Sequence, residues 1–161
     1  MLAAVYFYFD SNSYTMGHLA DTKDILLADD DADDALFFEL AMDELKFPYE
    51  LRVAVDGQML FVLLKDKLPY ILFLDIEMPC KDGIACIAEI RKNPAYDKLP
   101  IVMYSGYSLD RYREESFRSQ ANFYIAKANS VKEIAARLAK VFAIDWSNYM
   151  HYPPYDQFFL S

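Results

Sequence analysis

Residues 68–84 read LPYILFLDIEMPCKDGI, and this stretch carries the strongest structural signal in the chain. Its apolar run at 70–74 is continuous in Tyr, Ile, Leu and Phe. Such a run is typical of a parallel strand that is covered on both faces, because neither face then needs polar side chains. The run stops at Asp75. We therefore expect a buried strand that ends at a carboxylate.

Similar runs and helix-like segments alternate on either side of this strand. Further strands are expected at 24–28, 50–55, 101–104 and 122–126. Helical spacing of apolar residues predicts helices at 31–47, 57–66, 84–92, 109–118 and 131–142. Five strands that alternate with five helices predict an α/β fold, a doubly wound five-stranded parallel sheet with right-handed crossovers.

Polar side chains follow four of the five predicted strands. In doubly wound sheets the ligand site lies outside the carboxyl ends of the strands, so these residues are expected to lie close together. They are Asp29, Asp30 and Asp31 after the first strand, Asp75 after the third, Ser105 at the end of the fourth and Lys127 after the fifth.

This set of side chains indicates metal-assisted phosphoryl chemistry. Two carboxylates near 4 Å repel by about 4 kcal/mol at an effective dielectric of about 20, so one must be protonated or a divalent cation must lie among them. Mg²⁺ prefers such oxygen ligands. A carboxylate beside Mg²⁺, with an ammonium and a hydroxyl nearby, can act as a nucleophile toward a phosphoryl group. Because His18 and His151 lie in the flanking segments, histidine acid–base chemistry is not expected here.

Four stretches in the expected order resemble the receiver domains of two-component response regulators. They are ILLADDD (25–31), LPYILFLDIEMPCKDGI (68–84), LPIVMYSGY (99–107) and ANFYIAK (121–127). The resemblance covers about residues 23–141. It implies a flavodoxin-like sheet of strand order 2-1-3-4-5. It also implies a cytoplasmic, bacterial-type protein that is no enzyme beyond its own phosphoryl transfer and slow autodephosphorylation.

The resemblance implies a role for each acidic residue of the site. Asp75 would be the phosphoacceptor and would take its phosphoryl group from a histidine kinase or a histidine phosphotransfer protein. Asp29 and Asp30 would hold Mg²⁺ together with Asp75 and the backbone carbonyl of Glu77. The turn Asp82-Gly83 would begin the third helix.

The remaining family positions would bind the phosphoryl group and transmit its presence. Lys127 would pair with a phosphoryl oxygen, and the hydroxyl of Ser105 would bind the phosphoryl group and move on activation. Tyr124 would be the aromatic switch coupled to Ser105. The family usually has Pro after the lysine, in a cis turn, but here Ala128 follows. Because a non-proline cis bond costs about 3 kcal/mol, we expect a trans bond.

The acidic run at 29–34 contains more carboxylates than the metal site needs. We expect Asp31 to cap the N-terminus of the first helix. Asp33 and Asp34 are expected to be solvated residues of the helix start, where acidic side chains suit the helix dipole.

The ends of the chain lie outside this pattern, so we divide it into an N-terminal extension (1–22), a receiver domain (23–143) and an aromatic C-terminal tail (144–161). The extension has no basic residue before its apolar stretch and is a poor signal peptide. The tail is too apolar for solvated disorder. We expect it to pack on its own domain or on a second copy, with a docking peptide as the alternative.

The composition excludes several classes of function. The chain has 161 residues, with 25 acidic against 16 basic side chains and a net charge of −9, which argues against nucleic-acid binding. No apolar run is long enough to span a membrane. The four glycines are dispersed, which excludes glycine-rich nucleotide loops. Cys80 and Cys86 are expected to be reduced thiols.

With about twenty residues after the last helix, we expect a stand-alone receiver whose output is contact with a downstream protein. That contact, or a homodimer, would use the tail or the face of the fourth helix, fifth strand and fifth helix, where the fourth helix carries Arg111, Arg113, Glu114, Glu115 and Arg118. Two alternatives stay open. One is a small phosphatase with an Asp-x-Asp-like motif at 75–77, and the other is a receiver-like binding module that works without phosphorylation.

Overall fold

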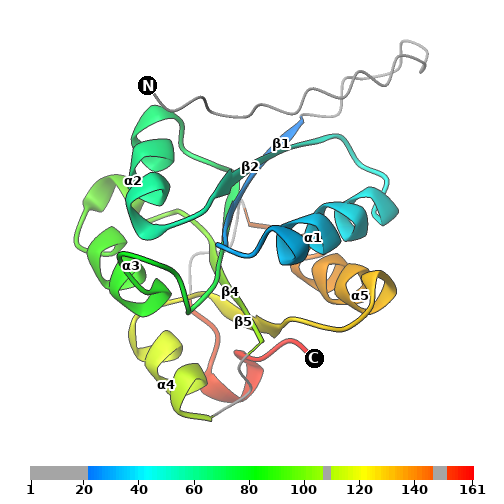
Figure 1. Cartoon of the computed structure of the whole chain (residues 1–161). Coiled ribbons are helices and arrows are strands. Elements are labelled where there is room, and N and C mark those ends of the chain that lie inside the picture. The colour runs from blue at the N-terminus through cyan, green and yellow to red at the C-terminus, as the bar shows by residue number, and fades with distance from the viewer. Residues whose placement is uncertain (1–21, 107–109, 147–151) are drawn as a thin grey trace.

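The computed structural model describes residues 22–106, 110–146 and 152–161. Strands and helices alternate along these ranges as predicted (Figure 1). The strands are β1 (Lys23–Ala28), β2 (Tyr49–Ala54), β3 (Ile71–Leu74), β4 (Ile101–Ser105) and β5 (Phe123–Ala126). The α-helices are α1 (Ala32–Glu44), α2 (Gly57–Asp66), α3 (Gly83–Ile90), α4 (Asp110–Arg118) and α5 (Val131–Phe142), and two short 3-10 helices are η1 (Pro94–Tyr96) and η2 (Tyr155–Gln157).

The five strands form one parallel sheet in the order β2-β1-β3-β4-β5. Helices α1 and α5 cover one face, and α2, α3 and α4 cover the other (Figure 1). This is the predicted flavodoxin-like strand order. The order places β1 and β3 side by side at the centre, so the residues that follow these two strands must be neighbours.

The central strands are apolar on both faces because each face packs against helices. In β1, Ile25 and Leu27 belong to the core under α1 and α5, whereas Leu26 and Ala28 belong to the core under the other helices. All four side chains have no exposed surface. This two-sided burial explains why the strands read as continuous apolar runs in the sequence.

Side-chain caps fix where the helices begin. The carboxylate of Asp31 accepts hydrogen bonds from the backbone N–H groups of Asp33 and Asp34, which confirms Asp31 as the N-cap of α1. The end of α1 was predicted wrongly, because the helix stops at Glu44 rather than at residue 47. Lys46 has a left-handed φ of 54°, a conformation that terminates a helix.

The C-terminal segment returns to the sheet. Residues 152–161 lie beside α4 and β5 (Figure 1), and Phe159 forms a parallel β-bridge with Tyr124. Of the two arrangements expected for the tail, residues 152–161 thus adopt packing on their own domain. The predicted N-terminal extension lies outside the described residues except for Thr22. Within the described ranges, no helix has the length and apolar character needed to cross a membrane.

Candidate functional site

The carboxyl ends of the strands border a pocket of about 630 Å³. Its lining is mostly acidic and includes a single lysine among the residues that the structure describes. The lining residues are Asp30, Asp31, Asp34, Asp75, Glu77, Met78, Pro79, Asp82, Gly106 and Lys127. The strand-end residues of the first, third and fifth strands therefore meet at one site, as the parallel topology requires.

Backbone hydrogen bonds across the sheet fix the positions of the charged residues. The N–H of Asp75 donates to the carbonyl of Ala28 at 2.9 Å, which ties the end of β3 to the end of β1. The N–H of Lys127 donates to the carbonyl of Ser105 at 2.9 Å and ties the end of β5 to β4. Because both residues are anchored through the backbone, their side chains enter the pocket from fixed points.

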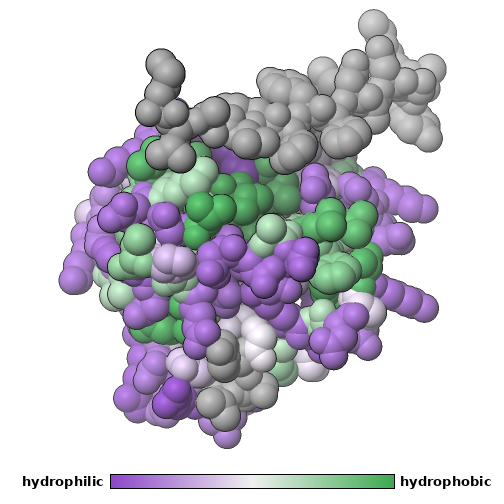
Figure 2. Space-filling model, viewed as in Figure 1, coloured by the Kyte–Doolittle hydropathy of each residue, from purple (hydrophilic) through white to green (hydrophobic). Residues whose placement is uncertain are grey.

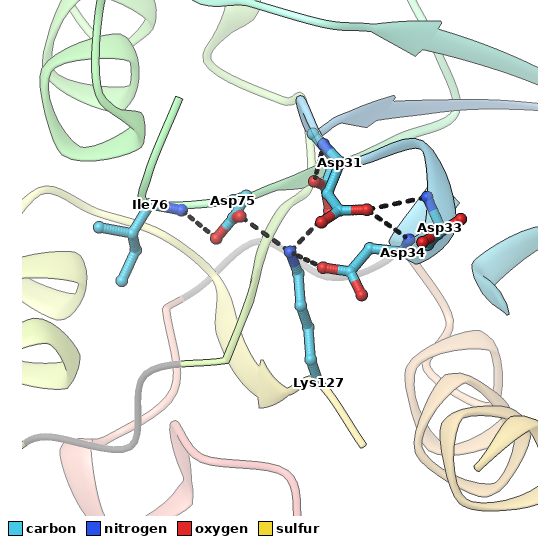
Figure 3. Close-up of polar contacts among 7 residues, drawn as sticks. Asp31, Asp33, Asp34, Asp75, Ile76 and Lys127 are labelled. Carbon is cyan, nitrogen blue, oxygen red and sulfur yellow. Dashed lines mark hydrogen bonds and ion pairs between the residues drawn. The ribbon is translucent and has the colours of Figure 1, made fainter. Parts of the chain in front are cut away.

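Lys127 is the electrostatic centre of the pocket (Figure 3). Its Nζ lies 2.8 Å from Asp29 Oδ2, 2.7 Å from Asp34 Oδ2 and 2.8 Å from Asp75 Oδ2. Burial alone would lower the pKa of Lys127, but the hydrogen bonds that its ammonium donates to Asp34 and Asp75, together with the ion pair with Asp29, outweigh burial and hold the pKa above its ordinary value. The ammonium is therefore charged at any physiological pH.

Asp29 is the most deeply buried carboxylate of the group, with an exposed fraction of 1%. Burial raises its pKa from 3.8 to about 6, although Lys127 and a hydrogen bond from the N–H of Asp31 oppose the shift. Asp29 Oδ2 is buried and accepts no well-oriented hydrogen bond from a described residue; Lys127 is its ion-pair partner. A second cation beside this oxygen would satisfy it further.

The acidic residues fit a hard divalent cation. Asp29, Asp30 and Asp75 each offer a carboxylate oxygen, and these oxygens lie within 4.8 Å of one another. Asp29 and Asp75 are buried, whereas Asp30 is exposed at the pocket mouth. Three closely spaced carboxylates with a solvent-accessible side suit Mg²⁺, which keeps several waters among its ligands.

The loop after Asp75 is held tightly against the site. The N–H of Ile76 donates to Asp75 Oδ1 at 2.6 Å, so one carboxylate oxygen is oriented by the backbone (Figure 3). The N–H of Gly83 donates to the carbonyl of Ile76 at 2.8 Å. A Cβ at Gly83 would lie 2.1 Å from the carbonyl oxygen of Asp75, so only glycine permits this approach. Asp82 then caps α3 by accepting from the N–H of Ala85 at 2.7 Å.

The two predicted switch residues are both buried and in contact. Ser105 and Tyr124 have no exposed surface, and their side chains share a hydrogen bond. Ser105 ends β4 directly before Gly106 of the pocket lining, and Tyr124 lies on the edge strand β5. Glu77 is exposed at the pocket mouth. The peptide bond between Lys127 and Ala128 is trans, as expected from the missing proline.

One residue of the site was missed from the sequence. We expected Asp33 and Asp34 to be solvated alike, and Asp33 is indeed exposed. For Asp34 the expectation is wrong, because its carboxylate binds Lys127 and lines the pocket. The helical turn after the N-cap Asp31 points Asp34 toward the strand ends and Asp33 away from them. The sequence alone did not show which side of the first turn of α1 faces the end of β5.

Comparisons with known proteins identify the family. The model of the response regulator receiver domain matches residues 25–139. An uncharacterized 14.6 kDa protein in the sodA1 3′ region of Leptolyngbya boryana is 32% identical over 109 residues, which are 65% of this chain and 78% of that protein. Response regulator Rcp1 of Synechocystis is 25% identical over 119 residues, or 70% of this chain and 81% of Rcp1.

Solved structures agree with this assignment. A candidate response regulator from Chloroflexus aurantiacus J-10-fl matches with a TM-score of 0.68 and 27% identity, over 77% of this chain and all of that one (100%). The Mn²⁺-bound form of Rcp1 shares the fold, with a TM-score of 0.68 and 23% identity over 82% of this chain and 99% of Rcp1. The chain therefore belongs to the response regulator receiver domains of two-component signalling.

Proposed function

We propose that this chain is a phosphoacceptor response regulator that is phosphorylated on Asp75 by a histidine kinase or a histidine phosphotransfer protein, in a Mg²⁺-dependent reaction. One observation carries the proposal, namely that Asp75 lies within 2.8 Å of Lys127 and within 4.8 Å of the acidic pair Asp29 and Asp30. A nucleophilic carboxylate, its countercharge and the ligands for a metal are thus in one pocket.

The residues of the chain divide the work of phosphoryl transfer. A carboxylate oxygen of Asp75 attacks the phosphorus atom, the bond from phosphorus to the donor nitrogen breaks, and an acyl phosphate forms. The N–H of Ile76 orients the Asp75 carboxylate. Lys127 stays protonated and supplies positive charge to the phosphoryl oxygens. Ser105 is the hydroxyl that would bind the phosphoryl group, with Tyr124 coupled to it through their shared hydrogen bond.

Asp29, Asp30 and Asp75, with the backbone carbonyl of Glu77, would hold Mg²⁺. When bound, the ion supplies neutralisation of the charge that develops on the transferring oxygens. The donor set supports this choice, because all the side-chain ligands are carboxylates and, among the described residues, no His or Cys offers a softer ligand to the cluster.

The output of the proposed regulator is contact with another protein in the cytoplasm, or formation of a homodimer. We expect no enzymatic activity beyond the phosphoryl transfer to Asp75 and slow hydrolysis of the acyl phosphate. The face of α4, β5 and α5 is the proposed contact surface, since it adjoins Tyr124.

Acetyl phosphate tests the proposal directly. Incubation with Mg²⁺ should add one phosphoryl group per chain, as measured by intact mass. Asp75→Asn should abolish the addition, whereas Asp33→Asn, a neighbouring exposed aspartate that does not bind Lys127, should leave it unchanged. Equal addition to Asp75→Asn would refute the proposal, and no addition to the wild-type chain would favour the phosphorylation-independent binding module.

The same reaction separates the regulator from the phosphatase alternative. A regulator holds its phosphoryl group and releases phosphate slowly. Sustained release of many phosphates per chain from a phosphate monoester would instead identify a small phosphatase with Asp75 as its nucleophile. Phosphate release measured over time with the Asp75→Asn control decides between the two.

A further inference from the structure

The C-terminal segment extends the sheet at the outer edge of β5. The N–H of Tyr124 donates to the carbonyl of Phe158 at 2.9 Å, and the N–H of Leu160 donates to the carbonyl of Tyr124 at 2.9 Å. These two bonds flank the parallel bridge between Tyr124 and Phe159. An edge strand offers backbone groups that another extended segment can pair with. Here the chain's own tail uses them.

Side chains of α4 complete the docking of the tail. Phe158 is 1% exposed, and its ring centroid lies 5.4 Å from that of Phe117 in α4 and 6.4 Å from that of Tyr124. The guanidinium of Arg113, also in α4, lies 3.9 Å from the ring centroid of Phe159. Two adjacent aromatic residues therefore fill two different subsites, one apolar and one cationic.

The fit between the tail and α4 is incomplete. A pocket of about 380 Å³ remains between them, lined by Asp110, Arg113, Tyr155, Asp156, Phe158 and Phe159. The Nε of Arg113 is buried, and no described residue accepts a hydrogen bond from it. Its ion pair with Asp110 is long, at 3.6 Å between Nη1 of Arg113 and Oδ1 of Asp110. Because a buried donor is stabilised by an acceptor, a ligand that offers one to the Nε of Arg113 would gain a hydrogen bond that no described residue of the tail makes.

We propose that the outer edge of β5 and the facing side of α4 form a strand-docking site for an extended segment of a partner protein with two adjacent aromatic residues. Residues 155–161 occupy this site as an intramolecular competitor that the partner must displace. The docking site includes the backbone of Tyr124, the proposed switch residue. A role of this site in signalling therefore rests on the proposed function, whereas the docking itself does not. Strand addition with side-chain pockets is an established mode of peptide recognition.

Because the tail is covalently attached to the domain, a partner segment needs a high affinity to displace it. A segment attached to the same chain has a high effective concentration at its site, so a free segment of equal intrinsic affinity binds poorly. Weakening the tail should therefore open the site to a peptide added in trans. This gives a test that needs no phosphoryl donor.

The probe is a fluorescein-labelled synthetic peptide of residues 152–161, YPPYDQFFLS, and the readout is fluorescence anisotropy. The full chain with F158A and F159A should bind it at least about tenfold more tightly than the wild-type chain does. The matched control is F37A, which removes a phenylalanine that is 45% exposed on α1 and should behave like the wild type. Adding F117A to the released variant should abolish binding, and a peptide with both phenylalanines replaced by alanine should bind no variant.

Two results would overturn the proposal. The first is equal binding of the peptide to the wild type and to F158A/F159A, which would indicate a different site. The second is no binding of the peptide to F158A/F159A when circular dichroism shows that this variant is folded. Should the double variant unfold, F159A alone is used, with the same criteria. The phosphorylation of Asp75 is measured separately by mass, so failure of either experiment leaves the result of the other standing.

Discussion

Two edges of the same sheet hold their neighbours by opposite means. At the carboxyl edge, the ammonium group of Lys127 binds three carboxylates at 2.7 to 2.8 Å. At the outer edge of β5, two backbone hydrogen bonds and the buried ring of Phe158 hold the tail.

Figure 2 shows hydrophilic residues over much of the visible face, with hydrophobic ones gathered over α1, where Leu36, Phe37 and Leu40 are exposed.

The difference concerns how each edge responds to change. The carboxyl edge depends on a few charged atoms at fixed positions, so a small displacement alters its chemistry. The tail depends on apolar burial and on a tether, so it can leave and return while the domain stays folded. The first arrangement suits a reaction site and the second suits a reversible cover.

A large loss of stability is expected at Gly83, where the backbone of the carboxyl edge is most crowded. Gly83→Ala should lower the free energy of unfolding by about 3 kcal/mol, because the new Cβ would overlap the carbonyl of Asp75. Gly106→Ala is the matched control, since a Cβ there meets no atom within 4 Å. Urea denaturation measures both. Similar small losses in the two variants would show that the loop after Asp75 is not held as described.

Truncation of a buried ring should cost more unfolding free energy in the core than in the tail. Phe73 and Phe158 are both at most 1% exposed. Phe73→Ala should lower the free energy of unfolding by about 4 kcal/mol, as for other core phenylalanines. Phe158→Ala should lower it by less than about 2 kcal/mol, because the tail can detach without global unfolding.

Hydrogen exchange adds the local readout. The amide of Leu160, which donates to the carbonyl of Tyr124, should exchange faster in Phe158→Ala, because the tail detaches more often there. In Phe73→Ala the local detachment of the tail is unchanged, so the protection lost by this amide should be smaller than in Phe158→Ala. Equal global losses in the two variants would mean that the tail is an inseparable part of the core, contrary to the comparison.

The raised pKa of Asp29 predicts a pH dependence of metal binding. Below its pKa of about 6, Asp29 is protonated and must lose that proton to bind a cation. The affinity for Mg²⁺ should therefore fall by up to about tenfold per pH unit as the pH drops below about 6. Calorimetric titration measures this, and Asp29→Asn should bind weakly with little pH dependence near 6. A constant affinity across this range would contradict the burial-driven shift.

The smallest effect is expected at Asp34. Both Asp33 and Asp34 lie in the first turn of α1, so either substitution by Asn removes a similar interaction with the helix dipole. Asp34→Asn also removes the ion pair with Lys127, which is partly exposed, so its unfolding free energy should be lower by about a further 0.5 kcal/mol. Equal unfolding free energies for the two variants would show that the ion pair between Asp34 and Lys127 does not stabilise the fold.

Much of the fold followed from the sequence because strand burial and helix capping are local signals. Each strand was predicted to within a residue at either end, and Asp31 was correctly assigned as a cap. The end of α1 was missed because the left-handed conformation of Lys46 has no Gly or Asn to signal it.

The site was predicted where parallel topology determines it and missed where helix phase does. Asp29, Asp75 and Lys127 follow strands, so their meeting could be foreseen. The contact between Asp34 and Lys127 joins residues 93 positions apart and depends on how α1 turns over the sheet. Likewise, the aromatic composition of the tail indicated burial. Which tail residue pairs with Tyr124 could not be predicted, because the alignment of the tail along β5 is not determined by a local sequence pattern.

The most direct test of the central claim is the location of the phosphoryl group. The chain is treated with acetyl phosphate and Mg²⁺, and the modified residue is mapped by tandem mass spectrometry after trapping of the acyl phosphate. We predict a single modification on Asp75, absent when Mg²⁺ is removed by a chelator. A modification on any other residue, or one that forms equally without the metal, would contradict the account of this pocket as a metal-assisted phosphoacceptor site.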